Sequence, residues 1–358
     1  MLPELYPLKL QAIYKPTIWG GHNLAALKPD LPATQLIGES WEAYDDCLIQ
    51  NGTLTGRSLH QAVAAWGRLL VGTASPTADH FPLLTKFIDA NDNLSVQLHP
   101  NNEQAQELEG YWCGKTEMWY VIGAAEGAKV ILGTAANEDH ALIRQRIGEG
   151  RLEENLQWLA VSAGDVVYVP AGRVHALGRG LLVYEVQQNS DHTYRLYDWH
   201  RLDAAGKGRE LHVEKGLRVL RFEQPAPGKL TPLRLAIGSH SVSHLKVSPY
   251  FAVSLIEADG GEVGSESNGG SFTLYTVLEG GGQLRWQGNT DELDLHQGDT
   301  VIVPAGLASH LILANGPLKL ICTTLPLPAD QLATRVVQPL AKAGYSATQI
   351  AQLLAAEL

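Results

Sequence analysis

Two copies of one nine-residue stretch, GDVVYVPAG at residues 164–172 and GDTVIVPAG at residues 298–306, decide how this chain folds. They share the pattern GDxVxVPAG, in which a short run rich in β-branched residues ends in a Pro/Gly turn. Such runs, bounded by turn residues, are typical of strands. The segments before the two copies also correspond, MWYVI at 118–122 and LYTVL at 274–278. The repeat therefore predicts two related β-rich units in one chain.

Short apolar runs of the same kind dominate the chain around the two copies, over about 5–135, 161–200 and 240–325. Helical spacing of apolar residues is confined to 137–159, to 212–220 and to the residues after 330. Gly148 and Gly150 split the first of these helical stretches. In the last, Ser346 and Gln349 have the spacing of a capping box, which predicts the start of a final helix. The predicted fold is mainly β.

Composition narrows the class of protein. The 358 residues suffice for about two domains. With 45% hydrophobic and 18% charged residues, the chain is neither disordered nor a coiled coil. The net charge of −11 does not favour binding to polyanions. We therefore expect neither nucleic acid nor an anionic membrane as a partner. Three widely spaced cysteines, no signal-peptide pattern and no long apolar run predict a cytoplasmic protein with reduced thiols.

The first copy of the repeat continues into His175, and this spacing resembles the second cupin motif, whose turn delivers a His into a β-barrel. Upstream, Gln97, His99 and Glu117 stand where the first cupin motif carries an H-x-H pair and a Glu. Gln97 and His99 are two residues apart, so they project from the same face of a strand. The four side chains form a nitrogen and oxygen ligand set that suits zinc, Fe(II), Mn, Ni or Co in an open catalytic site.

The second copy lacks this ligand set. Thr273 stands where Glu117 stands in the first copy, and no H-x-H or Q-x-H precedes it. His310 follows the second turn one residue later than His175 follows the first. Since one imidazole cannot hold a catalytic metal, we expect the second unit to be structural or to form a wall of the site.

Six further motifs follow one another along the chain: IWGG at 18–21, GESWE at 38–42, FPLLTK at 81–86, NLSVQLHP at 93–100, GKTEMWY at 114–120 and EVQQNSDHTYRLYD at 185–198. In this order, over about residues 5–325, the chain resembles the type I mannose-6-phosphate isomerases, and the last motif resembles the short bacterial branch of that family. Q-x-H in place of H-x-H is itself a family trait.

The resemblance implies two cupin (jelly-roll) β-barrels with a small helical insertion and a C-terminal helical tail. A catalytic N-terminal cupin is expected over residues 1–135 and 161–235, interrupted by the helical insertion at 136–160. A degenerate cupin is expected over 236–326, followed by the helical tail at 327–358. The tail is expected either to pack on the second barrel or to mediate self-association.

The resemblance also implies a zinc enzyme, with one zinc per chain, that interconverts mannose 6-phosphate and fructose 6-phosphate. By similarity, the metal ligands would be Gln97, His99, Glu117 and His175. Arg195 matches the catalytic arginine of the family. Positions that line the sugar-phosphate pocket of the family are matched by Lys86, Ser95 and Lys115.

Aldose–ketose isomerisation moves a proton between C1 and C2 through an enediolate, whose charge a Lewis-acid metal and a fixed arginine would stabilise. Arg195 cannot be the general base because a guanidinium stays protonated. Glu185 is a candidate base, with Lys115, His99 and metal-bound water as rivals. Because the chain is acidic overall, Lys86, Lys115 and Arg195, with Arg173 or Lys215, are expected to form a locally positive pocket.

Two other functions fit part of the pattern. Two His and one carboxylate resemble the facial triad of an Fe(II) oxygenase, although Gln97 and the Lys/Arg set argue against it. A non-catalytic sugar-binding cupin is the third possibility, which the retention of four ligands and Arg195 argues against. The expected partner is a small sugar phosphate, and the chain is expected to be a monomer or a homodimer.

Overall fold

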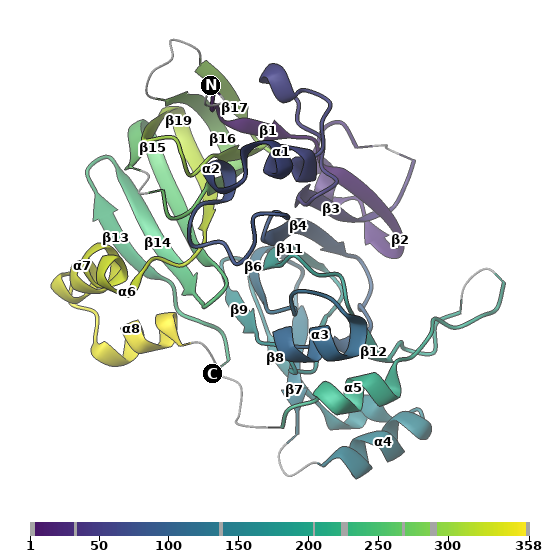
Figure 1. Ribbon diagram of the computed structural model, residues 1–358. Coiled ribbons are helices and arrows are strands. Elements are labelled where there is room, and N and C mark those ends of the chain that lie inside the picture. Colours follow the sequence, from purple (N-terminus) through teal and green to yellow (C-terminus); the bar gives the residue numbers. More distant parts are fainter. Residues whose placement is uncertain are drawn as a thin grey trace.

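Three β-sheets form the framework of the protein, and short helices lie beside them (Figure 1). The computed structural model describes residues 4–31, 34–135, 139–202, 205–222, 228–266, 269–286 and 292–355. Within these ranges no helix has both the length and the apolar character needed to cross a membrane. The cysteines Cys47, Cys113 and Cys322 are all free thiols.

The first sheet has six strands, which come from residues 13–188. Its central strands are buried on both faces, and every residue of Leu83–Ala90 is buried. All its pairings are antiparallel. The strand order is β2 (Ile13–Gly21), β3 (Ile37–Ala43), β4 (Leu83–Ala90), β11 (Leu181–Gln188), β6 (Glu117–Ala124) and β9 (Val166–Val169).

The second sheet has five shorter strands, in the order β12 (Tyr194–Tyr197), β5 (Val96–Leu98), β10 (His175–Leu177), β7 (Lys129–Thr134) and β8 (Leu156–Ala160). The predicted helical stretch at 137–159 is wrong at its C-terminal end. Helix α4 (His140–Gly148) and a 3-10 turn (Leu152–Asn155) are followed by β8, which pairs with β7. Sheet pairing overrides the local helical spacing there. Residues 136–138, where the insertion was expected to begin, lie outside the described ranges.

The third sheet takes its strands from residues 233–324, except for one strand from the N-terminal end of the chain. Its strands are β1 (Leu8–Leu10), β18 (Thr300–Val303), β16 (Thr273–Trp286), β19 (Ser309–Thr324), β15 (Ala252–Glu266), β14 (His240–Val247) and β13 (Leu233–Ile237), with β17 (Glu292–His296) paired to β16. β1 comes from the N-terminus of the chain yet pairs with β18. In the described residues, none of the three sheets closes on itself.

The two copies of the repeat adopt the same local structure. Gly164 donates its backbone N–H to Val121, and Gly298 donates its own to Val277. Both glycines have positive φ, 90° and 86°, a region that glycine reaches without strain. In the second copy, a Cβ on Gly298 would lie 2.0 Å from the carbonyl oxygen of Leu27, so no larger residue fits there.

Helices occupy the chain ends and connections. The predicted helix at 212–220 is α5 (Val213–Val219), and the predicted capping box of Ser346 and Gln349 opens α8 (Ala347–Leu354). The others are η1 (Asn23–Ala26), η2 (Gly52–Leu54), α1 (Leu59–Trp66), α2 (Arg68–Val71), α3 (Asn102–Glu109), α6 (Ala329–Leu332), a π-helical turn (Ala333–Val337) and α7 (Gln338–Lys342).

The C-terminal helices pack on the edge of the third sheet beside β13 and β14 (Figure 1). Leu340 and Leu353 of the tail share a buried apolar cluster with Leu233 and Val247 of the sheet. Lys246 donates to the carbonyl oxygen of Ala355 at the end of α8, over 2.6 Å. A lysine at a helix C-terminus is favoured by the helix dipole. The tail thus packs against the β13–β14 edge of the third sheet.

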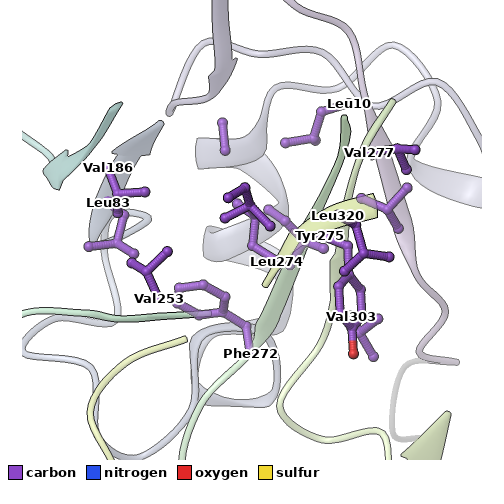
Figure 2. Packing of buried hydrophobic residues seen from close by; sticks show 14 of the residues in the cluster. Leu10, Leu83, Val186, Val253, Phe272, Leu274, Tyr275, Val277, Val303 and Leu320 are labelled. Atoms are coloured by element: carbon purple, nitrogen blue, oxygen red, sulfur yellow. The ribbon is translucent and has the colours of Figure 1, made fainter. Parts of the chain in front are cut away.

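One large apolar core joins the first and third sheets (Figure 2). Leu83 and Val186 of the first sheet face Val253 of the third sheet, and Phe272, which directly precedes β16, across this core (Figure 2). The ring centroids of Phe81 and Phe272 are 4.5 Å apart. Because apolar burial is worth roughly 25 cal/mol per Å², this shared core holds the two β-rich halves together.

Candidate active site

One row of ionisable side chains crosses the six-stranded sheet. Lys86 on β4 lies opposite Glu185 on β11, and Glu185 lies opposite Trp119 on β6. Directly paired residues of antiparallel strands share one face of a sheet. Glu117 is two residues before Trp119 on the same strand, so it shares that face as well.

A second row crosses the five-stranded sheet. Arg195 on β12 lies opposite Gln97 on β5, and Gln97 lies opposite His175 on β10. Residues from both sheets line one pocket of about 320 Å³. Seven of the nine site residues predicted from the sequence line this pocket: Lys86, Ser95, Gln97, Lys115, Glu117, Glu185 and Arg195.

The other two predicted residues, His99 and His175, contact Glu117. One ligand atom from each of these three residues lies within 4.8 Å of the other two, and each residue is 1% exposed. Glu117 Oε1 is 3.3 Å from His99 Nε2, and Glu117 Oε2 is 3.4 Å from His175 Nε2. Among the described residues, neither Nε2 nor Glu117 Oε2 has a hydrogen-bond partner. Buried polar atoms without a partner are rare, so this cluster fits a bound cation.

The backbone fixes the orientation of both imidazoles. His99 Nδ1 is 2.9 Å from the carbonyl oxygen of His192, and His175 Nδ1 is 2.9 Å from that of Arg173. A carbonyl oxygen only accepts, so Nδ1 carries the hydrogen and Nε2 keeps its lone pair. Burial lowers the pKa of His175 and, with Lys115 nearby, lowers the pKa of His99 to about 3. Both imidazoles are therefore neutral, as metal ligands must be.

Lys115 keeps the carboxylate of Glu117 ionised. Its ammonium lies 3.1 Å from Glu117 Oε1, and Lys115 is 3% exposed. Burial alone would raise the pKa of Glu117, but the positive charge of Lys115 lowers it well below its usual range. The cluster thus offers one anionic oxygen and two neutral nitrogens, a set that zinc and several other divalent metals accept. Gln97 adds an amide oxygen on the pocket wall, which accepts from Ser95 Oγ at 3.3 Å.

Glu185 is buried between an indole and an ammonium. Its Oε2 accepts a hydrogen bond of 2.6 Å from Trp119 Nε1, and its Oε1 lies 3.2 Å from Lys86 Nζ. Burial, and then repulsion from Glu117, raises the pKa of Glu185 to about 7. Burial would lower the pKa of Lys86, but Glu185 and Glu39 raise it, so Lys86 stays an ammonium. A carboxyl group that titrates near neutral pH can take and return a proton.

Two arginines lie at the pocket wall. Arg195 Nη1 donates to the carbonyl oxygen of Glu210 at 2.9 Å, while its buried Nε has no hydrogen-bond partner among the described residues. Arg209, which the sequence analysis missed, also lines the pocket and donates twice to Asp198. Burial, and then the charge of Arg209, lowers the pKa of Arg195. Arg209 lies outside every recognised motif, so no sequence signal pointed to it.

The pocket is not positive through its side chains alone, contrary to the expectation from the sequence. Lys86 and Lys115 are each held by a carboxylate, and neither Arg173 nor Lys215 is a lining residue. Lys215 instead pairs with Glu109 at 2.8 Å. Within the described residues, four carboxylates and four cations line the pocket: Glu39, Glu117, Glu185, Asp191, Lys86, Lys115, Arg195 and Arg209. A divalent cation would therefore tip the balance toward an anionic ligand.

The known proteins to which this chain is similar include mannose-6-phosphate isomerases. The sequence profile for the phosphomannose isomerase type I catalytic domain matches residues 7–114. A mannose-6-phosphate isomerase of Streptococcus mutans is 37% identical over 322 residues, which are 88% of this chain and 98% of that protein. The crystal structure of the Bacillus subtilis mannose 6-phosphate isomerase is 32% identical, with a TM-score of 0.79, and the match covers 88% of this chain and 99% of that one.

A more distant structure, a zinc-bound mannose 6-phosphate isomerase, shares the fold at 17% identity and a TM-score of 0.68. The match covers 90% of this chain and all of that one. The matched profile includes Gln97 and His99 but ends before Glu117 and His175. The grouping of those two side chains with His99 therefore rests on the geometry above.

Proposed function

This chain belongs to the type I mannose-6-phosphate isomerase family and interconverts mannose 6-phosphate and fructose 6-phosphate, and we propose that it does so with one zinc ion held by Gln97, His99, Glu117 and His175. The observation that carries the zinc proposal is the His99, Glu117 and His175 cluster, in which both Nε2 atoms and Glu117 Oε2 are buried and have no hydrogen-bond partner among the described residues. The imidazole and carboxylate donors suit zinc, and the zinc-bound relative shares the fold.

The protein's own groups would move and stabilise charge during the reaction. We infer that Glu185, which lines the pocket and has a pKa near neutral pH, takes the proton from C2 of open-chain mannose 6-phosphate and returns it to C1. The hydroxyl proton moves from O2 to O1 in the same conversion. Lys86, at 3.2 Å from Glu185, would hold the ionised carboxylate in place. Lys115 is the rival base, and its ion pair with Glu117 argues for a supporting role. When bound, zinc would supply Lewis-acid stabilisation of the negative charge on the sugar oxygens.

Arg195 and Arg209 would bind the anionic parts of the substrate. Among the described residues, the buried Nε of Arg195 has no hydrogen-bond partner, and its Nη1 donates to the backbone carbonyl oxygen of Glu210. Two neighbouring guanidinium groups repel each other, and an anion between them relieves this repulsion. Arg195 stays charged and would donate hydrogen bonds to the developing oxyanion or the phosphate. Ser95 and Lys86, also lining residues, would complete the binding surface.

The finer architecture is also a proposal. We infer that the two repeat copies mark two cupin units, a catalytic one at 1–135 and 161–235 with the insertion at 136–160, and a degenerate one at 236–326 followed by the tail at 327–358. The matching register of β6 with β9 and of β16 with β18 supports this division. The pairing of β1 with β18 means that the N-terminus contributes to the sheet of the second unit. A cytoplasmic location and a monomeric or homodimeric state remain predictions.

A coupled assay with fructose 6-phosphate, run with and without a chelator, tests the proposed function. We expect turnover that chelation abolishes and that zinc restores, with one zinc per chain by elemental analysis. Turnover insensitive to removal of the metal would overturn the zinc proposal. Oxygen uptake measured in parallel separates an Fe(II) oxygenase, and sugar-phosphate binding without any turnover would point to a non-catalytic cupin.

A further inference from the structure

A second group of metal-ligating side chains lies apart from the pocket. One ligand atom each from Asp45, His60 and His80 lies within 4.8 Å of the other two. None of these residues lines the active-site pocket. We propose that they form a second divalent-metal site, open to solvent, for a transition metal of the zinc, nickel or cobalt class.

Backbone contacts hold the three residues together. Asp45 follows β3, His60 is the second residue of α1, and His80 precedes β4. The N–H of His60 donates to the carbonyl oxygen of Asp45 at 2.9 Å, and the N–H of Phe81 donates to Asp45 Oδ1 at 3.0 Å. The capping box of Ser58 fixes where α1 begins. The three ligands are therefore positioned before any metal arrives, which lowers the cost of binding.

The side chains face one another. His80 Nδ1 lies 2.7 Å from Asp45 Oδ2, and the ring centroids of His60 and His80 are 5.1 Å apart. On its other side His80 stacks on Trp112, at 5.9 Å and 10° between the rings. Asn189 Nδ2 donates to Asp45 Oδ2 at 3.2 Å, an outer contact of the kind that orients carboxylate ligands in metal sites.

The surroundings favour a cation. The chain carries a net charge of −11, and the acidic residue Asp46 follows Asp45 directly in the sequence. The carboxylate of Asp45 is 13% exposed and the ring of His80 is 37% exposed, so a metal can enter from solvent. Water would fill the remaining coordination positions, as in an open site with three protein ligands.

The ligand types restrict the metal. Mg²⁺ and Ca²⁺ prefer oxygen donors, and two of these three residues offer imidazole nitrogen. An imidazole pair with one carboxylate suits zinc, nickel or cobalt. The competing interpretation is that Asp45 only braces the loops through its hydrogen bonds to Phe81, His80 and Asn189. That interpretation predicts no saturable metal binding beyond the active-site ion.

Metal titration of the loaded enzyme tests the proposal. Enzyme that retains its first ion after dialysis is titrated with zinc or cobalt(II), followed by calorimetry and elemental analysis. We expect the wild-type enzyme to bind a second metal ion per chain. The His60→Ala variant should bind this second ion at least tenfold more weakly. His60 is exposed and its ring is not part of the Asp45 hydrogen bonds, so this variant should fold.

Two further variants separate the outcomes. His296 lies 3.4 Å from the single carboxylate of Asp299, so His296→Ala is a matched control that should keep the second equivalent. His175→Ala should lose the active-site ion but keep the second. A wild type that binds only one equivalent, or a His60→Ala variant that binds the second with unchanged affinity, would overturn the proposal. Loss of the second ion in His296→Ala would also overturn it.

Discussion

Glu117 and Thr273 occupy the same register position in the two copies of the repeat. Glu117 on β6 lies opposite Val169 of β9, and Thr273 on β16 lies opposite Val303 of β18. The flanking turns make matching backbone hydrogen bonds. Thus one strand position holds a carboxylate beside two imidazoles in the first copy and a hydroxyl in the second.

Replacing Glu117→Gln should remove the metal from the active site. The variant loses the anionic oxygen that lies 3.3 and 3.4 Å from the two imidazoles, and it leaves Lys115 without its partner. Zinc content measured on the purified protein should fall from one equivalent to near none, and isomerase activity with it. Thr273→Val is the matched control and should keep its zinc. Full zinc occupancy in the glutamine variant would contradict the ligand assignment.

The Arg195→Ala substitution should lower kcat without removing the zinc ion. A donor to a developing oxyanion is worth about 100- to 1000-fold in kcat. Arg195 is not one of the clustered ligands, so zinc content should stay at one equivalent. Arg209→Ala, measured alongside, should mainly raise KM, because Arg209 lines the pocket but is already paired with Asp198. An Arg195 variant that also lost zinc would mean that Arg195 supports the metal site instead.

The activity should depend on pH through Glu185. As a general base it must be ionised, so kcat/KM should fall as the pH drops below about 7, the pKa to which burial and Glu117 raise this group. Glu185→Gln should lose most of its activity, keep its zinc, and lack this acid limb in what activity remains. A pH–rate profile of both proteins checks this. If the pH–rate profile of Glu185→Gln fell at low pH in the same way as that of the wild type, the titrating group would not be Glu185.

The buried ion pair of Lys28 and Glu42 should stabilise the contact between the N-terminal part of the chain and the second copy of the repeat. Lys28 Nζ lies 2.5 Å from Glu42 Oε2 and also donates to the carbonyl oxygen of Gly298 in the second repeat turn. Lys28→Met leaves Glu42, 1% exposed, as an unpaired buried charge, which should cost about 3–5 kcal/mol of unfolding free energy.

Lys9→Met is the matched control for that substitution. Lys9 reaches the same turn through Asp299 at 2.7 Å, but its side chain is 22% exposed. More exposed ion pairs contribute about 0.2–1 kcal/mol. Urea denaturation of the three proteins gives the comparison. Equal losses in both variants would show that burial of the Lys28–Glu42 pair is not what matters.

Stability should decrease in mild acid through His310. Burial lowers the pKa of His310 to about 4, while its Nε2 is bonded to the Tyr275 hydroxyl at 2.8 Å. The unfolded state therefore binds a proton near pH 6.5 and the folded state only near pH 4. The contribution of His310 to the free energy of unfolding is therefore fully present above pH 6.5. It decreases toward pH 4, by up to about 1.4 kcal/mol per pH unit. His310→Gln should show a shallower loss between pH 6.5 and 5 in urea denaturation. An equally steep loss would exclude His310 as the cause.

Local patterns predicted the repeated strands, the helix at 212–220, the start of the final helix and the residues of the candidate metal cluster. The strand runs at 166–169 and 300–303 and the capping box at Ser346 depend on neighbours within a few residues. His99, Glu117 and His175 could be named because each stands at a fixed offset from a motif. The strand β8 was not predicted, because its partner β7 outweighs the helical spacing of its own residues.

By itself, the sequence determined that two copies of one β-rich unit exist, that only the first keeps a ligand set, and which family the chain resembles. Tertiary structure alone decided that β1 joins the distant sheet, that Lys86 and Lys115 are neutralised by carboxylates, and that Arg209 reaches the pocket. It also brought Asp45, His60 and His80 together. The reason is physical: strand and turn preferences are set by adjacent residues, whereas charge pairing and ligand grouping depend on which distant segments the packed sheets bring into contact.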